Sequence, residues 1–214
     1  MTLRDRVELF RAFGREAATS LKPLGFARGR GQLLASPVSD QVWAIVGLNK
    51  AIEADHVEVN PVMGLRHEAI QSLIRESLGL PELAVYSMTM SASLGYLMPE
   101  PRYRPVIVTS ETDLRQAAND LAVDVERYGL PFVRKHKELA EIAEAVQSPP
   151  FNGEHIRVYG LPAAYFLIGD YSAMEDVLKE HLKDLAGKIY PAAVQYRQFA
   201  RVLRARATAL RQKG

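Results

Sequence analysis

The stretch from Asp40 to Gly64 constrains the fold most strongly, because it has the pattern of two β-strands joined by a short polar turn. Residues 42–48 are apolar on both faces, which is typical of a strand that is covered on both sides at the centre of a sheet. In the second strand Val57 and Val59 point to one face. The polar side chains that alternate with these valines lie on the opposite face and are His56, Glu58 and Asn60. The pattern therefore predicts a sheet with one buried face and one partly polar face.

Helical periodicity dominates much of the remaining chain. Apolar residues recur at intervals of three and four in the ranges 2–22, 64–78, 110–129, 131–147, 172–185 and 189–212. Further strands are expected at 26–35, 85–90 and 106–109. Together these patterns predict an α+β fold with an antiparallel sheet of four to six strands, helices packed on one face, and a helical C-terminal half. We expect a sheet-rich front half with two helices, residues 1–109, and a helical back half, residues 110–214, packed as one compact unit.

The tripeptide Gly-Leu-Pro occurs at 79–81, 129–131 and 160–162. At the first two positions the glycine suits the left-handed residue that follows a helix, and the proline prevents the helix from continuing. These tripeptides therefore predict helix ends at Gly79 and Gly129. Helix starts are predicted where Thr2 and Asp5 resemble a capping pair and where Ser172 and Glu175 have the spacing of a capping box.

Composition excludes several classes of protein. The chain has 214 residues and no cysteine, so disulfides, thiolate metal sites and cysteine nucleophiles are excluded. No apolar run approaches the roughly 18 to 20 residues that span a bilayer, and the charged N-terminus has no apolar signal-peptide segment. We therefore expect a soluble cytoplasmic protein that does not associate with membranes.

Charge is distributed unevenly along the chain. After Asp184 there are seven basic residues and no acidic one, whereas the preceding part carries 20 basic and 25 acidic residues. A basic terminal helix is one indication of nucleic-acid binding. It also suits a helix that docks on its own acidic body, with the acidic stripe at 138–144 as the expected complement. We favour the docked helix, because aromatic residues interleaved with the basic ones, as in nucleic-acid binders, are few.

The first third of the chain resembles a group of uncharacterised bacterial α+β domains. The resemblance is carried by an N-terminal helix, the turn Leu21-Lys22-Pro23-Leu24-Gly25-Phe26, a basic strand, and a strand that ends at Asn49-Lys50. In that group a leucine-to-Gly-Phe turn leads into an antiparallel meander of strands. The resemblance implies a fold and brings no catalytic residues with it.

One hypothesis concerns a metal ion. His56 and Glu58 share a strand face, and His67 follows at the predicted start of the next helix. Two histidines and a carboxylate could hold Zn²⁺ or another divalent ion and leave a position open for water. Their spacing matches no established metal signature. The alternative is a solvated or hydrogen-bonded strand face, and we favour that alternative.

A second hypothesis concerns arginines in two segments that strand pairing could bring together. Arg28 and Arg30 lie in the glycine-rich strand 26–35, and Arg102 and Arg104 lie in an extended, proline-spaced segment. Guanidinium groups bind carboxylates and phosphates through paired hydrogen bonds. Such a surface could hold an acidic protein, an anionic small ligand or RNA. The alternative is that these charges protect an edge strand against aggregation.

Signatures of common enzymes are missing, including the Gly-x-Ser-x-Gly elbow and the phosphate-binding loop. We therefore expect a non-catalytic binding or protein-interaction module without a cofactor, comparable in size with toxin-neutralising immunity proteins. Its expected partner is a protein or an anionic ligand. The candidate surface consists of His56, Glu58, Asn60, Arg28, Arg30, Arg102 and Arg104. A metal-assisted hydrolase using His56, Glu58 and His67, and nucleic-acid binding through the last helix, are the alternatives.

Overall fold

The computed structural model describes residues 2–29, 33–80, 88–148, 150–151, 153 and 156–212. The chain forms two compact units, each built from two separate segments. Unit 1 comprises Met1–Arg66 and Ser91–Lys135, and unit 2 comprises His67–Met90 and His136–Gly214. This division differs from the halves expected on either side of residue 110, because segment 114–135 belongs to unit 1 and segment 67–90 to unit 2.

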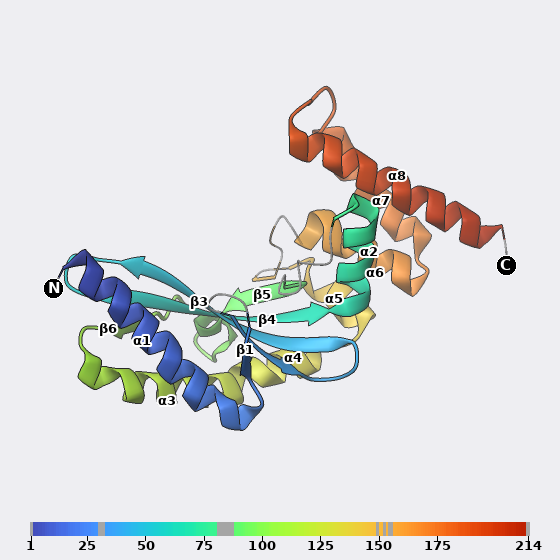
Figure 1. Ribbon diagram of the computed structural model, residues 1–214. Coiled ribbons are helices and arrows are strands. Elements are labelled where there is room, and N and C mark those ends of the chain that lie inside the picture. The colour runs from blue at the N-terminus through green and yellow to red at the C-terminus, as the bar shows by residue number, and fades with distance from the viewer. Residues whose placement is uncertain are drawn as a thin grey trace. The chain divides into compact units, whose positions relative to one another are not determined.

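The prediction of an α+β fold with an antiparallel sheet is confirmed. Six strands are described in one sheet, in the order β1-β2-β3-β4-β5, with β6 paired to β4 (Figure 1). Apart from the last residue of β4 and the first of β5, the sheet belongs to unit 1. The strands are β1 (Ala27–Arg28), β2 (Leu33–Pro37), β3 (Val42–Ile52), β4 (Val57–His67), β5 (Met90–Ser93) and β6 (Val106–Val108).

The two strands predicted between Asp40 and Gly64 are β3 and β4. They are the longest of the described strands and lie next to each other in the sheet. Alternation along β4 is as predicted: Val57 and Val59 are buried, whereas Glu58 and Asn60 are half-buried. β6 pairs antiparallel with the start of β4 and sets Glu58 opposite Ile107. The partly polar face of β4 thus lies beside the segment that carries Arg102 and Arg104.

The prediction of a single strand at 26–35 is wrong. The chain instead forms the hairpin β1–β2, in which Ala27 pairs with Ala35 and Arg28 with Leu34. The N–H of Gly29 donates to the carbonyl of Leu33 at 2.8 Å and closes the turn.

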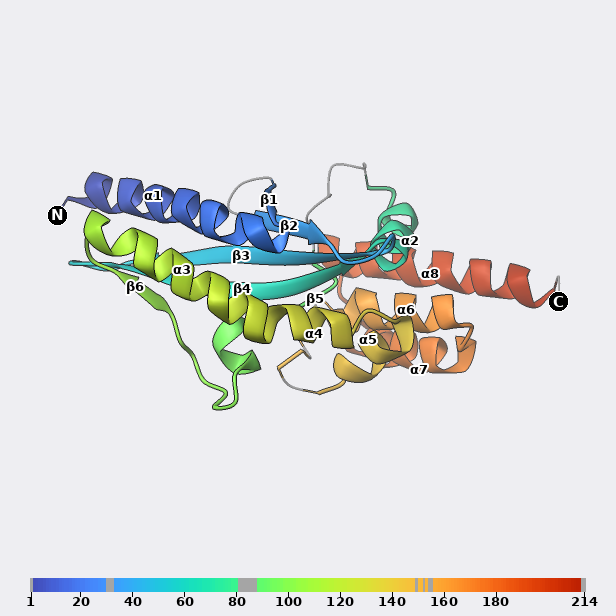
Figure 2. The same ribbon diagram turned by 90° about the horizontal axis from the view of Figure 1, so that it is seen from below.

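Two long helical segments cover one face of the sheet in unit 1. They are α1 (Leu3–Leu21) and the run formed by α3 (Leu114–Asp124), the π-helical turn η4 (Val125–Gly129) and α4 (Leu130–Lys135). Figure 2 shows α1 and α3 side by side on that face. The predicted cap of α1 is confirmed, because Thr2 and Asp5 exchange backbone and side-chain hydrogen bonds.

The three Gly-Leu-Pro tripeptides have two different structures. Gly79 ends α2 (Glu68–Leu78) in the left-handed conformation, with φ of 64°, as predicted. Gly129 does not end its helix. The N–H of Leu130 donates to the carbonyl of Val125, five residues back, and the chain then continues as α4. This wider turn accommodates Pro131, which has no N–H for a regular helical bond and whose ring would clash with the preceding turn.

Position 129 is also closely packed against the sheet. A Cβ atom on Gly129 would lie 3.0 Å from the sulfur of Met63 on β4, so the helix packs close against the sheet. The same arrangement recurs in unit 2, where the π-helical turn η5 (Ile156–Gly160) leads into α6 (Leu161–Ile168). Tyr128 and Tyr159 precede the two glycines and therefore occupy equivalent positions in the two turns.

Unit 2 consists largely of helices. Besides α2 and α6 it contains α5 (Leu139–Ala145), α7 (Tyr171–Asp184) and α8 (Pro191–Arg211). Tyr196, Phe199 and Leu203 of α8 are almost fully buried. The capping box predicted at Ser172 is wrong, because Asp170 caps α7 by accepting the N–H of Ala173 at 3.0 Å. Within the described ranges, the helices are all too short or too polar to cross a membrane.

Candidate binding groove

The polar residues of β4 do not converge on one site. The carboxylate of Glu58 accepts a hydrogen bond from the hydroxyl of Tyr103. The Nδ2 of Asn60 donates to the hydroxyl of Ser93 at 3.0 Å. His56 lies just before the strand, and its Nδ1 is 2.7 Å from a carboxylate oxygen of Asp55. Each predicted residue therefore has a different neighbour.

The structure does not bring the proposed metal ligands together. Glu58 and His67 lie near opposite ends of the 11-residue strand β4, which places them roughly 30 Å apart at about 3.3 Å per residue. Among the described residues, no group of three or more histidines and carboxylates could hold a metal ion. His67 is buried, and its Nδ1 has no hydrogen-bond partner among the described residues. Burial lowers the pKa of His67, partly opposed by Glu138 and Glu68.

The two arginine pairs also lie apart. Arg28 is exposed on β1, and β2, β3 and β4 separate β1 from β6. At about 4.8 Å between strands, that separation is roughly 19 Å. Arg30 lies outside the described residues. Of the four arginines in the predicted surface, only Arg102 and Arg104 therefore lie together, in the loop that leads into β6.

A groove of about 690 Å³ lies between this loop and α3, entirely within unit 1. Arg102, Arg104 and Ile107 contribute one wall, and Asp120, Asp124 and Tyr128 contribute the other. The second wall follows from helical geometry, because residues 120, 124 and 128 are spaced by four and share one face. Figure 2 shows β6 and the long loop before it below α3. We call this feature the binding groove.

Close backbone packing fixes the loop wall of the groove. The N–H of Arg102 donates to the carbonyl of Gly95 at 3.3 Å. A Cβ atom on Gly95 would lie only 2.4 Å from the carbonyl oxygen of Arg102, so only glycine fits there. Tyr103 is tied to β4 through Glu58, and Arg104 forms an ion pair with Glu100 at 3.1 Å. The backbone of Arg102 and the side chain of Arg104 are therefore held in place before any partner arrives.

The groove has unused hydrogen-bonding capacity, although Arg104 is also paired with Glu100. The Nε of Arg104 is buried without an acceptor among the described residues. On the other wall, burial and then the neighbouring Asp120 raise the pKa of Asp124, while Arg104 and Arg127 oppose the rise. Asp120 accepts a hydrogen bond from Gln116 at 2.8 Å. The groove thus presents cationic and anionic groups on facing walls, which suits a partner that carries both signs of charge.

Two large side chains belong to the lining of the groove. Ile107 is 47% exposed, and Tyr128 lies on the wall that carries the aspartates. Aromatic residues and arginine are enriched at protein interfaces and dominate their binding energy. Sequence analysis missed Asp120, Asp124 and Tyr128. The available signal was the pair of acids four residues apart on one helix, beside an otherwise apolar stripe.

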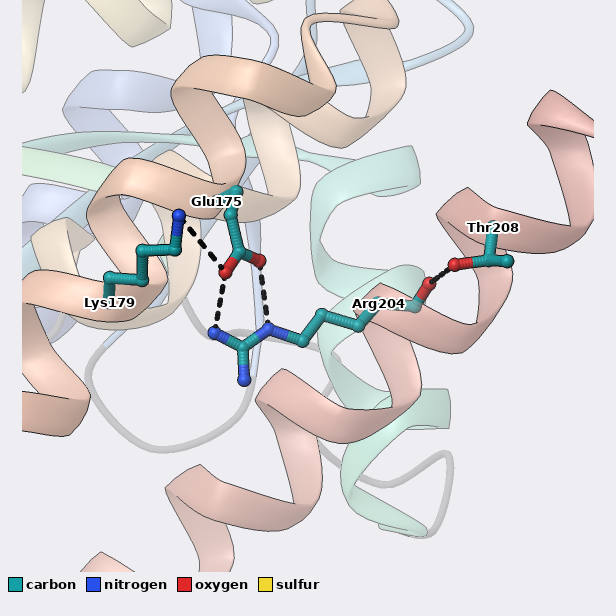
Figure 3. Close-up of polar contacts among 4 residues, drawn as sticks. All are labelled: Glu175, Lys179, Arg204 and Thr208. Atoms are coloured by element: carbon teal, nitrogen blue, oxygen red, sulfur yellow. Dashed lines mark hydrogen bonds and ion pairs between the residues drawn. The ribbon is translucent and has the colours of Figure 1, made fainter.

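Two arginines of the basic helix α8 pair with carboxylates of other helices. Arg204 forms two hydrogen bonds of 2.8 Å with the carboxylate of Glu175 on α7 (Figure 3). Arg206 is 3.1 Å from Glu76 of α2. The acidic stripe expected as the complement has another role: Glu138 and Glu141 cap the start of α5. Docking of α8 on acidic residues is therefore observed, but on different residues from those predicted.

Comparison with known proteins adds no further constraint. No protein-family model, curated protein or solved structure matches this chain. The resemblance to bacterial α+β domains remains an expectation from the sequence, and arguments about function depend on the geometry of the chain itself.

Proposed function

We propose that this protein is a non-catalytic binding module whose binding groove holds an extended segment of a partner protein. The observation that supports this proposal is that Arg102 and Arg104 lie across the groove from Asp124. Ile107 and Tyr128 belong to the same lining. Recognition of a peptide needs both kinds of feature, since charged groups set register and specificity and aromatic side chains supply buried area.

A peptide fits the groove better than a small anion does. An anion would meet Asp120 and Asp124 across from the arginines. A peptide segment can instead place an acidic side chain or a carboxylate against Arg102 and Arg104, and a basic side chain against the two aspartates. Because burial penalises the charged form of Asp124, a cation that pairs with this carboxylate in the complex recovers part of that cost.

The two alternatives receive no support from a specific observation. The hydrolase hypothesis requires His56, Glu58 and His67 to meet, and the structure keeps Glu58 and His67 near opposite ends of β4. Nucleic-acid binding requires arginines of α8 that can reach phosphates. Arg204 and Arg206 are instead engaged by carboxylates, so a switch to phosphate would break existing ion pairs.

Selection from a random peptide library against the immobilised full-length chain tests this function. We expect the selected peptides to share at least one acidic and one basic position. They should lose about tenfold or more in affinity for the double variant Arg102→Ser/Asp124→Ser, equivalent to about 1.4 kcal/mol or more. The affinities are measured by fluorescence anisotropy with labelled peptides.

The matched control is Arg201→Ser on α8, because Arg201 is also an exposed arginine but lies in unit 2. We expect the control to bind the selected peptides as the unmodified chain does. If the groove variant and the control bind equally well, or if no common charge pattern emerges from the library, the groove is not the binding site.

A further inference from the structure

Unit 2 contains a second cleft that the proposed function does not use. The cleft has a volume of about 670 Å³ and is lined by residues of η5, the end of α7 and the start of α8. Clefts of roughly 300 to 1,000 Å³ with mainly apolar walls are the usual binding sites of small molecules. Val158, Leu161, Val177 and Leu185 provide such walls. We call this feature the aromatic cleft.

Aromatic rings meet edge to face along one wall. The ring of Tyr196 lies 5.5 Å from that of Tyr159 and 4.4 Å from the imidazole of His181, with interplanar angles of 70° and 82°. Tyr159 also packs edge to face on Phe199 at 5.0 Å. These distances lie within or just below the preferred range for edge-to-face pairs. Tyr196 and Phe199 are almost fully buried. The half-buried rings of Tyr159 and His181 are therefore the ones that a bound planar molecule would contact.

The π-helical turn η5 places Tyr159 in this array. Because Pro162 cannot donate a helical hydrogen bond, the chain widens before α6, as it does before Pro131 in unit 1. Wide turns of this kind occur often at functional sites. The two turns are therefore linked to the two clefts: Tyr128 lines the binding groove and Tyr159 lines the aromatic cleft.

The loop at the opposite edge of the aromatic cleft is held in place. The Nη1 of Arg197 donates to the carbonyl of Lys188 at 2.9 Å, and the Nη2 of Arg197 donates to the same oxygen. This contact fixes the loop that carries Tyr190, another residue of the cleft. A fixed rim means that a ligand need not order the loop when it binds, which favours affinity.

Charges around the aromatic cleft come in opposite pairs. Arg157 lies 3.9 Å from Glu180, and Asp184 and Lys188 are the other two charged residues of the lining. A ligand with net charge would therefore gain little from the rim and would lose hydration on entering apolar walls. We propose that the aromatic cleft binds a small planar aromatic molecule without net charge.

Indole is a suitable probe for this proposal, because it is planar, aromatic and neutral. In titrations of the ¹⁵N-labelled full chain, we expect indole to shift amide resonances of Arg157–Leu161 and of the loop at Lys188–Tyr190. The variant Ala192→Trp fills the cleft from its lining and should weaken indole binding about tenfold or more, which corresponds to about 1.4 kcal/mol.

The control is Val194→Trp, which adds the same side chain at an exposed position that does not line the cleft. This variant should bind indole with unchanged affinity, and so should the groove variant Asp124→Ser, because its substitution lies in unit 1. Equal affinity of the Ala192→Trp and Val194→Trp variants would overturn the proposal. Absence of shifts in the named segments would also overturn it.

The charge of the ligand is tested with benzoate and benzylamine, which are planar aromatic molecules with a negative and a positive charge at neutral pH. We expect both to bind at least about tenfold more weakly than indole. Tighter binding of either ion than of indole would contradict a site for uncharged rings.

Discussion

A carboxylate and an arginine are neighbours in each unit, and the two pairs behave in opposite ways. In unit 2, Glu175 and Arg204 form two hydrogen bonds of 2.8 Å, and these bonds lower the pKa of Glu175 (Figure 3). In unit 1, Asp124 and Arg104 line the same groove without such a bond. There, burial raises the pKa of Asp124. The first pair stabilises its unit, whereas the second leaves binding capacity unused.

The difference between the two pairs distinguishes charges that stabilise the fold from charges that are available to a binding partner. A fully bonded pair such as Glu175–Arg204 joins two helices and has nothing left to offer a partner. A desolvated carboxylate near an arginine without full pairing costs stability, and such costs are typically found at binding sites. Residue type alone does not distinguish the two pairs, because each consists of an acid and an arginine.

The largest effect is expected from a change that displaces the arginine wall of the groove. In the variant Gly95→Ala, the new Cβ would lie 2.4 Å from a backbone oxygen of Arg102, so the loop must move. Overpacking of this kind costs roughly 1 to 3 kcal/mol. We expect a lower midpoint in urea unfolding, together with loss of binding to the selected peptides.

Gly153→Ala is the control for that prediction, because no atom of the described residues, apart from its chain neighbours, lies within 4 Å of a Cβ placed at Gly153. We expect its urea midpoint to match that of the unmodified chain. A Gly95→Ala variant with unchanged stability and peptide binding would show that the loop does not position the arginines.

A smaller effect is expected on breaking the structural pair. The Glu175→Gln variant removes one charge from a pair whose side chains are 29% and 40% exposed, so solvent screening reduces the loss to about 1 kcal/mol. The comparison variant is Glu76→Gln, which breaks the single, more exposed contact with Arg206 and should cost about 0.5 kcal/mol or less. A double-mutant cycle of Glu175→Gln with Arg204→Met measures the coupling. Equal losses in the two single variants would remove the distinction between the bonded pair and an ordinary surface contact.

Acid should destabilise unit 2 in two stages. Burial lowers the pKa of His67 below its ordinary value of 6.5, so the unfolded chain binds a proton at this site before the folded chain does. The contribution of His67 to stability is therefore present above about pH 6.5 and declines as the pH falls through the folded-state pKa of His67. The pKa of Glu175 is also lowered, and its contribution is lost at lower pH, below its ordinary value of 4.5.

Urea unfolding of the unmodified chain and of the His67→Leu variant between pH 7.5 and 5 measures the first stage. We expect the dependence on pH in this window to be weaker in the variant, because the variant lacks the buried imidazole. The same decline in both proteins would assign the acid sensitivity to another group.

The smallest effect concerns Asp124, and its sign is opposite to that of Glu175. Because the folded-state pKa of Asp124 is raised, folding favours its protonated form, and this contribution is lost as pH rises. The variant Asp124→Asn should therefore be more stable than the unmodified chain at pH 7, by about 0.5 kcal/mol or less. It should also bind the selected peptides more weakly. A variant that loses stability at pH 7 would show that Asp124 is structural, as Glu175 is.

The sequence predicted the features that depend on neighbouring residues. The predicted alternation of apolar and polar residues at 57–60 is found in β4. The capping box of Thr2 and Asp5 begins α1, and Gly79 ends α2. Predictions failed where two local signals compete. Asp170 rather than Ser172 caps α7, and a wide turn lets the helix continue past Gly129 despite Pro131. In both places an alternative hydrogen bond was available that pattern alone does not rank.

The binding groove was predicted only in part, because sequence pattern does not show which distant segments pack together. Arg102 and Arg104 stood out as clustered cations, and Asp120 and Asp124 shared a helix face that could be recognised from their spacing. Nothing in the spacing showed that the loop and the helix form one groove, or that Arg28 lies three strands away from it.

The sequence by itself determined the class of fold and most of its helices and strands, because hydrophobic periodicity and capping act over a few residues. Only the tertiary structure decided which charges are bonded, since the partners of Arg204 and Arg206 lie 29 and 130 residues away in the chain. Hydrogen bonds and burial between distant segments arise from packing. That packing gives Arg204 two hydrogen bonds to Glu175. Arg104 pairs with Glu100 through Nη2, and its Nε has no acceptor among the described residues.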